Sequence, residues 1–301
     1  MLDSLLESLI NNFKNLDYPI HLIYHEDISH SESYKILFSK YKNYIHVHTR
    51  ETFFLNKLSL LRPLNLLWYL KFSWIRSYYD NFKNILDSIL YDSKVRYILL
   101  STDDQIFYKK KNISKNIFDI INKNPKSYSY RLNVNDYFDD EHQIRDTYEI
   151  KVNKIEHDKI LEWNSSKIKS NNLWSYNFNV DGTIYECNSL YNLISPFIYN
   201  MPTTLESIGL WESRFRKYYW KCMSDTNRSM IGVQANNIQT TNDTPQANFD
   251  LNLLSKLYME GYNIDYEKYD INEKKYIFVP KFIPLKKNGK VYYLTEDGKL
   301  S

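Results

Sequence analysis

The chain has 301 residues, of which 43% are hydrophobic and 25% are charged, enough for one large globular domain with a smaller C-terminal addition. Its formal net charge of +3 is too small to indicate a nucleic-acid-binding surface. No apolar run is long enough to span a membrane, and the acidic start lacks the basic segment of a signal peptide. We therefore expect a cytoplasmic protein that does not bind nucleic acid and has no membrane-spanning segment.

Cysteine and glycine usage excludes several kinds of site. Two cysteines, Cys187 and Cys222, are too few for a disulfide framework or a cysteine-based zinc site. Only six glycines are present, and no glycine-rich phosphate-binding loop occurs among them. Any bound phosphate must therefore be held by a metal ion, by basic side chains or by ordinary backbone.

The first hundred residues predict the order β-α-β-α-β, after an amphipathic helix at about 2–15. The pattern predicts strands at 19–25, 44–48 and 95–100, a helix at 29–41, and a long helical region after Pro63. This order is typical of a parallel sheet covered by helices. His21, His25, His46 and His48 lie on or beside these strands, and His46 and His48 should face the same side of one strand. A metal-binding histidine pair is an alternative interpretation, although no acidic or cysteine partner has a suitable spacing.

The rest of the chain predicts a mixture of short elements. A helix at 113–122 precedes a strand at 128–132 and a polar, acidic surface loop at 133–147. Asp181 and Gly182 form a turn signature between two strand-like pieces within 174–185. Further along, the sequence predicts helices at 188–199, from Pro202 and at 251–259, a long polar loop at 225–248, and a basic, strand-forming tail from Lys274.

The strand at 95–100 is followed by Thr102, Asp103 and Asp104. A continuous apolar strand is normally buried in the middle of a sheet, so acids directly after it should lie at the sheet's carboxyl edge, where ligands bind. Carboxylates are suitable ligands for Mg²⁺ or Mn²⁺, which in turn hold substrate phosphates. The alternative is an ordinary turn, since aspartate is common in turns.

These pieces, in this order, resemble the GT-A class of nucleotide-sugar-dependent glycosyltransferases. Thr102-Asp103-Asp104 resembles the DxD-type motif of that class, with threonine at the first acidic position. Other segments resemble bacterial and viral members, and the resemblance covers roughly residues 18–265. Those segments are Tyr130–Leu132, Trp174–Tyr176, Val180–Tyr185, Pro202–Glu206 and Val233–Gln239.

The resemblance implies a GT-A-like α/β fold, with a mostly parallel central sheet flanked by helices. Residues 1–132 would form the nucleotide-sugar-binding half, 133–265 a mixed α+β acceptor half, and 266–301 a C-terminal extension. The implied reaction is hexosyl transfer from a UDP- or GDP-linked sugar to a hydroxyl of a saccharide or glycoprotein acceptor. Mn²⁺ or Mg²⁺ would be the cofactor. Inversion of the anomeric centre by a single displacement is the expected outcome, and retention stays open. The oligomeric state is left open.

The resemblance also implies roles on the donor side. Asp104 would be the principal metal ligand, and Asp103 a second ligand and donor contact beside Thr102. Arg131 would pair with the diphosphate, or alternatively hold a neighbouring acid in a structural salt bridge. The base and ribose would be flanked by Tyr24, His25, Glu26 and Glu51, which otherwise belong to ordinary surface loops.

On the acceptor side, an inverting transferase needs a carboxylate base. Glu206 is the first candidate, and Glu212 and Asp181 are its rivals. Glu206 could instead complement a helix dipole. Asp181 is also a candidate acceptor contact, and its alternative is an ordinary Asp-Gly turn. Trp174 and Trp211 could stack on acceptor sugars or be core residues.

Two other functions remain open from the sequence. The first alternative is a non-catalytic protein of the same fold that binds a nucleotide or a sugar. It is suggested by the threonine in the acidic motif and by the lack of one clear candidate for the catalytic base. A nucleotidyltransferase would also hold a metal with acids, but it usually carries a glycine-rich triphosphate loop, and glycine is scarce here.

Overall fold

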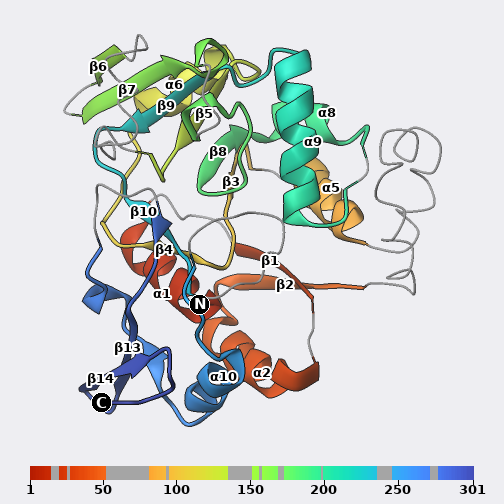
Figure 1. Cartoon of the computed structure of the whole chain (residues 1–301). Coiled ribbons are helices and arrows are strands. Elements are labelled where there is room, and N and C mark those ends of the chain that lie inside the picture. The colour runs from red at the N-terminus through yellow and green to blue at the C-terminus, as the bar shows by residue number, and fades with distance from the viewer. Residues whose placement is uncertain are drawn as a thin grey trace.

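The computed structural model describes residues 1–14, 20–25, 28–51, 81–92, 95–134, 151–155, 158–168, 173–197, 199–235, 246–271 and 277–301. These parts form a mixed α/β structure with several sheets (Figure 1). The described helices are α1 (Leu2–Asn12), α2 (Ser31–Tyr41), α5 (Phe82–Asp92), α6 (Lys115–Lys123), α8 (Cys187–Ile194), α9 (Pro202–Phe215) and α10 (Leu251–Met259). None of these described helices is long and apolar enough to cross a membrane.

The largest described sheet has six strands, and most of its pairings are antiparallel. Its order is β3 (Tyr97–Leu100), β8 (Thr183–Glu186), β5 (Tyr128–Arg131), β9 (Lys221–Asp225), β7 (Asp158–Asn164) and β6 (Lys151–Ile155). Only β5 and β9 run parallel. The prediction of a mostly parallel sheet is therefore wrong. Strand β8, from the second half of the chain, inserts between β3 and β5 and runs against both.

The strand that precedes the acidic motif, β3, does not lie in the middle of the sheet as predicted. In the described sheet, β3 lies at the edge and is half-buried rather than buried in the middle. Alternate residues of β3 still contact two apolar layers, because successive side chains of a strand point to opposite faces. Ile98 and Leu100 pack against one layer, and Tyr97 and Leu99 against the other. This two-sided packing accounts for the continuous apolar run in the sequence.

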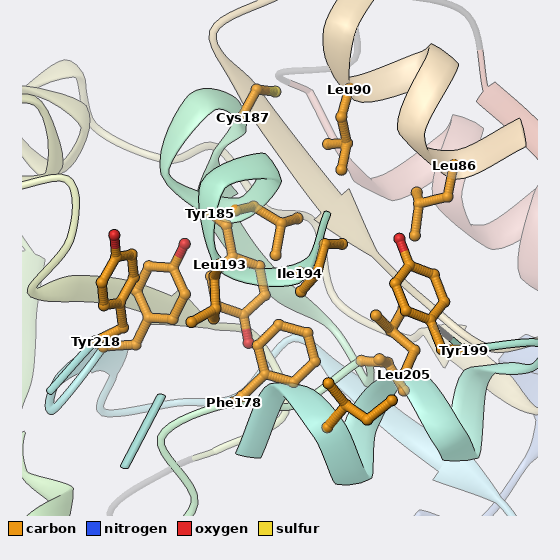
Figure 2. Close-up of a cluster of buried hydrophobic side chains, with 14 of the residues drawn as sticks. Leu86, Leu90, Phe178, Tyr185, Cys187, Leu193, Ile194, Tyr199, Leu205 and Tyr218 are labelled. Carbon is orange, nitrogen blue, oxygen red and sulfur yellow. The ribbon is translucent and has the colours of Figure 1, made fainter. Parts of the chain in front are cut away.

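Helices form the two layers. On one face, α5, α8 and α9 pack around Tyr185, Leu193 and Tyr199 (Figure 2). On the other face, α1 and α6 pack against Tyr130 and Ile184. The helices predicted from Pro202 and at 251–259 are confirmed as α9 and α10.

Strands β1 (Ile20–His25) and β2 (Ile45–Arg50) form a separate two-stranded parallel sheet joined through α2. The parallel pairing predicted for these two strands is confirmed, with Ile20 opposite Ile45. Tyr24 packs against Tyr34 and Phe38 of α2, with ring centroids 5.1 and 4.9 Å away. The predicted helical region after Pro63 lies largely outside the described residues, as does most of the acidic loop at 133–147.

The predicted long loop at 225–248 is partly wrong. It contains β10 (Met230–Val233), which pairs antiparallel with β4 (Gln105–Phe107) and parallel with β12 (Ile277–Phe278). Three buried apolar residues, Met230, Ile231 and Val233, are enough to form this strand within a polar stretch. Of the two strand-like pieces predicted around Asp181, only the second forms a strand, which is β8.

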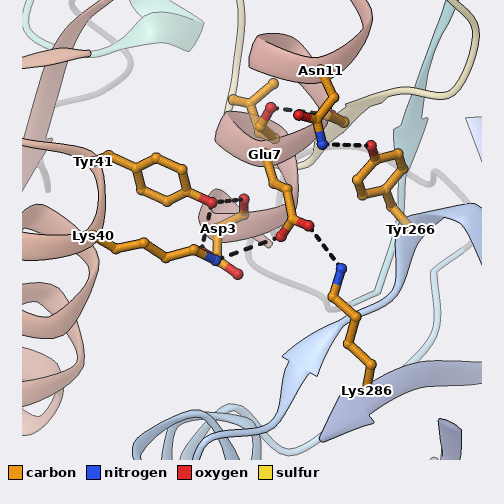
Figure 3. A network of polar contacts seen from close by, with 9 residues as sticks. Asp3, Glu7, Asn11, Lys40, Tyr41, Tyr266 and Lys286 are labelled. Carbon is orange, nitrogen blue, oxygen red and sulfur yellow. Dashed lines mark hydrogen bonds and ion pairs between the residues drawn. The ribbon is translucent and has the colours of Figure 1, made fainter. Parts of the chain in front are cut away.

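The strand-forming tail predicted from Lys274 is confirmed by β13 (Phe282–Lys287) and β14 (Lys290–Thr295). Together with β11 (Asn263–Ile264), which precedes the predicted tail, they form an antiparallel sheet, called here the C-terminal sheet. Lys286 donates to Glu7 of α1 at 2.7 Å, and the Asn11 amide donates to the Tyr266 hydroxyl at 3.2 Å (Figure 3). Ile283, Leu285 and Leu294 also share a core with Ile106 and Ile231 of strands β4 and β10.

Candidate functional site

Carboxylates from distant segments meet around the hydroxyl of Thr102. Leu100 is the register partner of Thr183 in the antiparallel β3–β8 pair, so extending the pair by two residues places Thr102 opposite Asp181. The Thr102 hydroxyl oxygen lies 2.7 Å from Asp104 Oδ1 and 2.8 Å from Asp181 Oδ1. The residues Thr102, Asp104, Asp181 and Glu206 are called here the acid group.

Asp181 is held by a well-bonded loop before β8. Its N–H donates to the side chain of Asn179. The backbone N–H of Asn179 donates to the Tyr185 hydroxyl, and that hydroxyl donates to the Asn179 carbonyl, each at 2.8 Å. Gly182 follows with φ +66°, and a Cβ there would lie 2.6 Å from Met230 Cε. The turn predicted at Asp181 is therefore present, and it also places the carboxylate in the acid group.

Asp104 is held from two other directions. Its carbonyl accepts from Val233 N–H at 2.6 Å, which joins the acidic motif to the end of β10. Its Oδ2 accepts from the Gln234 side-chain amide at 3.3 Å. Burial raises the pKa of Asp104, and the hydrogen bond from Thr102 acts in the opposite direction. Asp103 is exposed beside it.

Glu206 reaches the acid group from α9. The helix begins at Pro202, and the Thr204 hydroxyl accepts from Met201 N–H at 3.1 Å in its first turn. Gly209, one turn beyond Glu206, lies so close to Phe178 that a Cβ would approach its ring to 2.4 Å. This close approach brings the Glu206 carboxylate to the N–H of Val180, from which it accepts a hydrogen bond.

Burial and mutual repulsion make the acid group electrostatically unusual. Burial, and then the neighbouring Asp104 carboxylate, raise the pKa of Asp181 to about 6. Burial, and then Asp181, raise the pKa of Glu206 to about 7. Carboxyl groups with such pKa values can exchange protons near neutral pH, as general bases must. The arrangement can therefore accept a proton and can also bind a cation.

The chemistry of the donor set fits a divalent cation that is shared with substrate. Within the described residues, no three carboxylate, imidazole or thiolate side chains are arranged to enclose a metal ion. Mg²⁺ is typically held by one or two carboxylates, with water and substrate phosphates completing its shell. Asp104 and Asp103 are two adjacent carboxylates of that kind, one recessed and one exposed.

Arg131 lies in the interior beside the acid group. It is fully buried, its guanidinium lies 5.6 Å from the centroid of the Trp163 ring, and it donates to the carbonyl of Tyr176. Its positive charge acts to lower the pKa of Glu206, against the stronger effect of burial. The charge of the buried Arg131 guanidinium therefore acts electrostatically on the Glu206 carboxylate.

The other predicted donor residues lie on the β1–β2 sheet. Tyr24 packs against α2, and His25 is exposed at the end of β1. Glu51 follows β2, and its backbone N–H donates to the Asn81 side chain at 2.9 Å. Because the two strands are parallel, their ends place His25 and Glu51 at one edge of this sheet. Glu26 lies outside the described residues.

The predicted acceptor residues separate into core and surface. Trp174 is buried against Trp163, with ring centroids 4.6 Å apart, so its packing accounts for it as a core residue. Trp211 is 70% exposed on α9. Glu212 is half-buried six residues after Glu206, which turns it about 240° around the helix. Glu206 and Glu212 therefore cannot both face the acid group.

Three histidines of the β1–β2 sheet lie close together, in agreement with the prediction that His46 and His48 face the same side of a strand. The ring centroid of His21 lies 5.2 Å from that of His46 and 5.3 Å from that of His48. His21 Nδ1 and His48 Nε2 are 3.0 Å apart. Burial lowers the pKa of both His21 and His48, so the neutral imidazoles are favoured. Within the described residues, these histidines do not belong to a group of three or more side chains that could hold a metal ion.

Two residues that position the site were missed by sequence reasoning. Gln234 lies in a segment that resembles glycosyltransferases, but an amide in a polar loop gives no sign that it contacts Asp104. Gly209 lies within an ordinary helical pattern. Glycine is unfavourable in the interior of a helix, and this was the one sign that another side chain packs closely there.

The comparisons with known proteins are consistent with this picture at a coarse level. No protein-family model matches the chain. The chain is similar to the bifunctional glycosyltransferase pgtA of Dictyostelium discoideum, with 24% identity over 215 residues. The similar region is 64% of this chain and 28% of that protein, so the chain spans little more than a quarter of that relative's length. The similarity supports a distant relationship to glycosyltransferases.

Proposed function

We propose that the chain is a glycosyltransferase that moves a hexosyl group from a nucleotide-diphospho-sugar to a hydroxyl acceptor, with Mn²⁺ or Mg²⁺ as cofactor. The observation that carries this proposal is the meeting of Asp104 and Asp181 at the Thr102 hydroxyl, with Glu206 close enough to Asp181 for the two carboxylates to repel each other. The distant similarity supports glycosyl transfer in general. The donor, the metal and the stereochemistry belong to the proposal.

On the donor side, Asp104 and Asp103 would hold the divalent cation. When bound, that cation neutralises the negative charge that develops on the leaving nucleoside diphosphate. Gln234 and Thr102 fix the orientation of the Asp104 carboxylate through one hydrogen bond to each oxygen. Glu51 and His25, at one edge of the β1–β2 sheet, would contact the base and ribose.

On the acceptor side, Glu206 would take the proton of the acceptor hydroxyl. The acceptor oxygen then forms a bond to the anomeric carbon while the bond from that carbon to the diphosphate oxygen breaks. One displacement of this kind inverts the anomeric centre. Asp181 raises the basicity of Glu206 by placing a second negative charge close to it. A pKa of about 7 suits a base that works near neutral pH.

Calorimetric titration with UDP- and GDP-sugars, with and without Mn²⁺, tests the donor side. We expect binding that needs the metal in the wild type and is lost in Asp104→Asn. The matched control is Asp225→Asn, because Asp225 is an acid of β9 that pairs with Lys111. Absence of binding to every donor, with or without Mn²⁺, would contradict the proposal.

A second candidate function is a binding protein that kept the fold without turnover. The threonine at position 102 favours it, because one acid of the motif is missing. Donor binding that persists while neither transfer nor hydrolysis of the sugar is detected would support this second function.

A further inference from the structure

Helix α9 carries two aromatic side chains on its solvent side that the acid group does not use. Trp211 is 70% exposed and Phe215 is 79% exposed. They lie four residues apart and therefore on the same side of the helix. The side of α9 that packs inward carries Leu205, Ile208, Gly209 and Ser213 instead. In Figure 1, α9 lies on the outside of the molecule, at the opposite end from α10.

Three exposed cations lie at the C-terminal end of α9. Arg214 is in its last turn, and Arg216 and Lys217 follow directly. Within the part of the chain that the structure describes, none of them forms an ion pair with a carboxylate. Arg216 donates to the Asn192 carbonyl at 3.1 Å and lies 5.0 Å from the centroid of the Tyr218 ring. Trp211, Arg214, Phe215, Arg216 and Lys217 are called here the α9 tip.

Helix electrostatics explains only part of the α9 tip. Cations near the last carbonyls of a helix stabilise its dipole, so Arg214, Arg216 and Lys217 have an ordinary structural reason to be there. That reason does not extend to Trp211 and Phe215, which expose large apolar surfaces to water and leave most of that surface uncovered by the fold. Among the described residues, nothing covers most of either ring.

We infer that the α9 tip binds the surface of an anionic phospholipid bilayer. Tryptophan and phenylalanine enter the boundary between headgroups and acyl chains, while arginine and lysine contact lipid phosphates and anionic headgroups. Both rings are largely exposed, and the three exposed cations beside them match the charge of an anionic surface. A soft, flat bilayer can cover both rings, whereas a folded partner would need a matching pocket.

The orientation this contact imposes bears on the acid group. Glu206 precedes Phe215 by nine residues on the same helix, a distance of about 13 Å along its axis. A bilayer held at the α9 tip therefore lies at a fixed, short distance from the acid group. The inference itself rests on the exposed side chains alone and does not depend on the proposed function.

Vesicle flotation of the full chain tests the inference. Vesicles of phosphatidylcholine, with or without phosphatidylserine, are mixed with the protein at low and high salt. We expect binding that requires phosphatidylserine and weakens with salt, because the cations supply the charge attraction. In Trp211→Ser/Phe215→Ser we expect the partition coefficient to fall at least about tenfold, because two apolar side chains are lost. The fold should be unaffected, because both residues are exposed.

The matched control is Leu251→Ser/Met259→Ser, which removes two exposed apolar side chains from α10 at the other end of the molecule. This variant should bind vesicles like the wild type. Arg214→Gln/Arg216→Gln/Lys217→Gln should lose the dependence on phosphatidylserine. Failure of the wild type to bind, or equal binding by the aromatic double variant, would overturn the inference. Donor titration is a separate readout, so either proposal can fail without the other.

Discussion

Thr102 and Asp181 are 79 positions apart in the chain, yet the Thr102 hydroxyl oxygen lies 2.8 Å from Asp181 Oδ1. The same hydroxyl lies 2.7 Å from Asp104 Oδ1. A carboxylate at position 102 would add a third negative charge beside two acids whose pKa values are already raised. Threonine instead contributes a neutral hydroxyl, which can donate to one acid while it accepts from the other when that acid is protonated.

Replacing this hydroxyl should weaken the site without unfolding the chain. Thr102→Val removes the hydroxyl that donates to this pair of carboxylates and lowers their pKa, so their charged forms become less stable. We expect metal-dependent donor binding to weaken by about 1–2 kcal/mol. Calorimetry measures the change. Thr102→Ser restores the hydroxyl and should recover most of the affinity, and no recovery would exclude the proposed hydrogen-bonding role.

The pH dependence of turnover should report on Glu206. Because the pKa of Glu206 is raised to about 7 and a base acts only when deprotonated, the transfer rate should rise as the pH increases through about 7. Glu206→Gln should lower the rate by about 10²–10⁴-fold and abolish this rise. The control is Glu212→Gln, on a different side of α9, which should keep the wild-type profile. A wild-type profile in Glu206→Gln would assign the base elsewhere.

Glu206 should also affect stability, with a defined sign. A carboxyl group whose pKa is raised on folding stabilises the fold below its unfolded pKa, and this stability is lost as the pH rises through the folded value. Wild-type stability should therefore fall as the pH rises toward about 7, and Glu206→Gln should fall less. Thermal unfolding of both proteins across this range provides the comparison. Parallel curves would contradict the raised pKa.

Gly182 should be hard to replace. Gly182→Ala puts a Cβ at φ +66° and 2.6 Å from Met230 Cε, so we expect a loss of about 1–3 kcal/mol in the free energy of unfolding. Gly289→Ala is the matched control, because Gly289 has φ +76° with nothing within 4 Å of its Cβ position. The difference between the two variants in chemical denaturation isolates the contact with Met230. Equal losses would mean that only the backbone angle matters.

The histidine cluster should make the fold sensitive to acid. Burial and the neighbouring imidazoles lower the pKa of His21 and His48. A lowered pKa means that stability is present above the unfolded value of about 6.5 and is lost as the pH falls through the folded value. His48→Gln should show a smaller acid-induced fall in melting temperature than the wild type. His25→Gln, at the end of β1, is the control and should follow the wild-type curve.

The C-terminal sheet should depend on apolar packing more than on its ion pair. Ile283 is fully buried in the core shared with β4 and β10, so Ile283→Ala should cost about 2–5 kcal/mol. Lys286 is 39% exposed, so loss of its pair with Glu7 in Lys286→Ala should cost less than about 1 kcal/mol. Denaturant titrations of the two variants provide the measurement. A larger loss in Lys286→Ala would reverse this ranking.

Local patterns predicted much of the secondary structure. Pro202 and the apolar spacing after it indicate α9, and the Asp181-Gly182 pair indicates the turn before β8. All four members of the acid group were also named from the sequence. Their roles remain predictions, because proximity alone does not show catalysis.

Pairings between distant segments could not be predicted in the same way. The sequence of β3 does not specify whether β2 or β8 lies beside it, so the sheet was predicted parallel. Trp174 and Trp211 are the same residue type, and only the fold shows that Trp174 is buried and Trp211 is exposed. Glu212 and Glu206 differ in their position around a helix, which sequence reasoning did not use to choose between them.

The contact between Glu7 and Lys286 joins residues that are 279 positions apart. The apolar residues of α1 also pack with residues as distant as Met230 and Tyr258, so their core is incomplete until those residues have been added to the chain. Such non-local closure slows folding, because the entropy of ordering a long chain is lost before its contacts form. During synthesis on the ribosome, the native contacts of α1 therefore become complete only after Lys286 has been added to the chain.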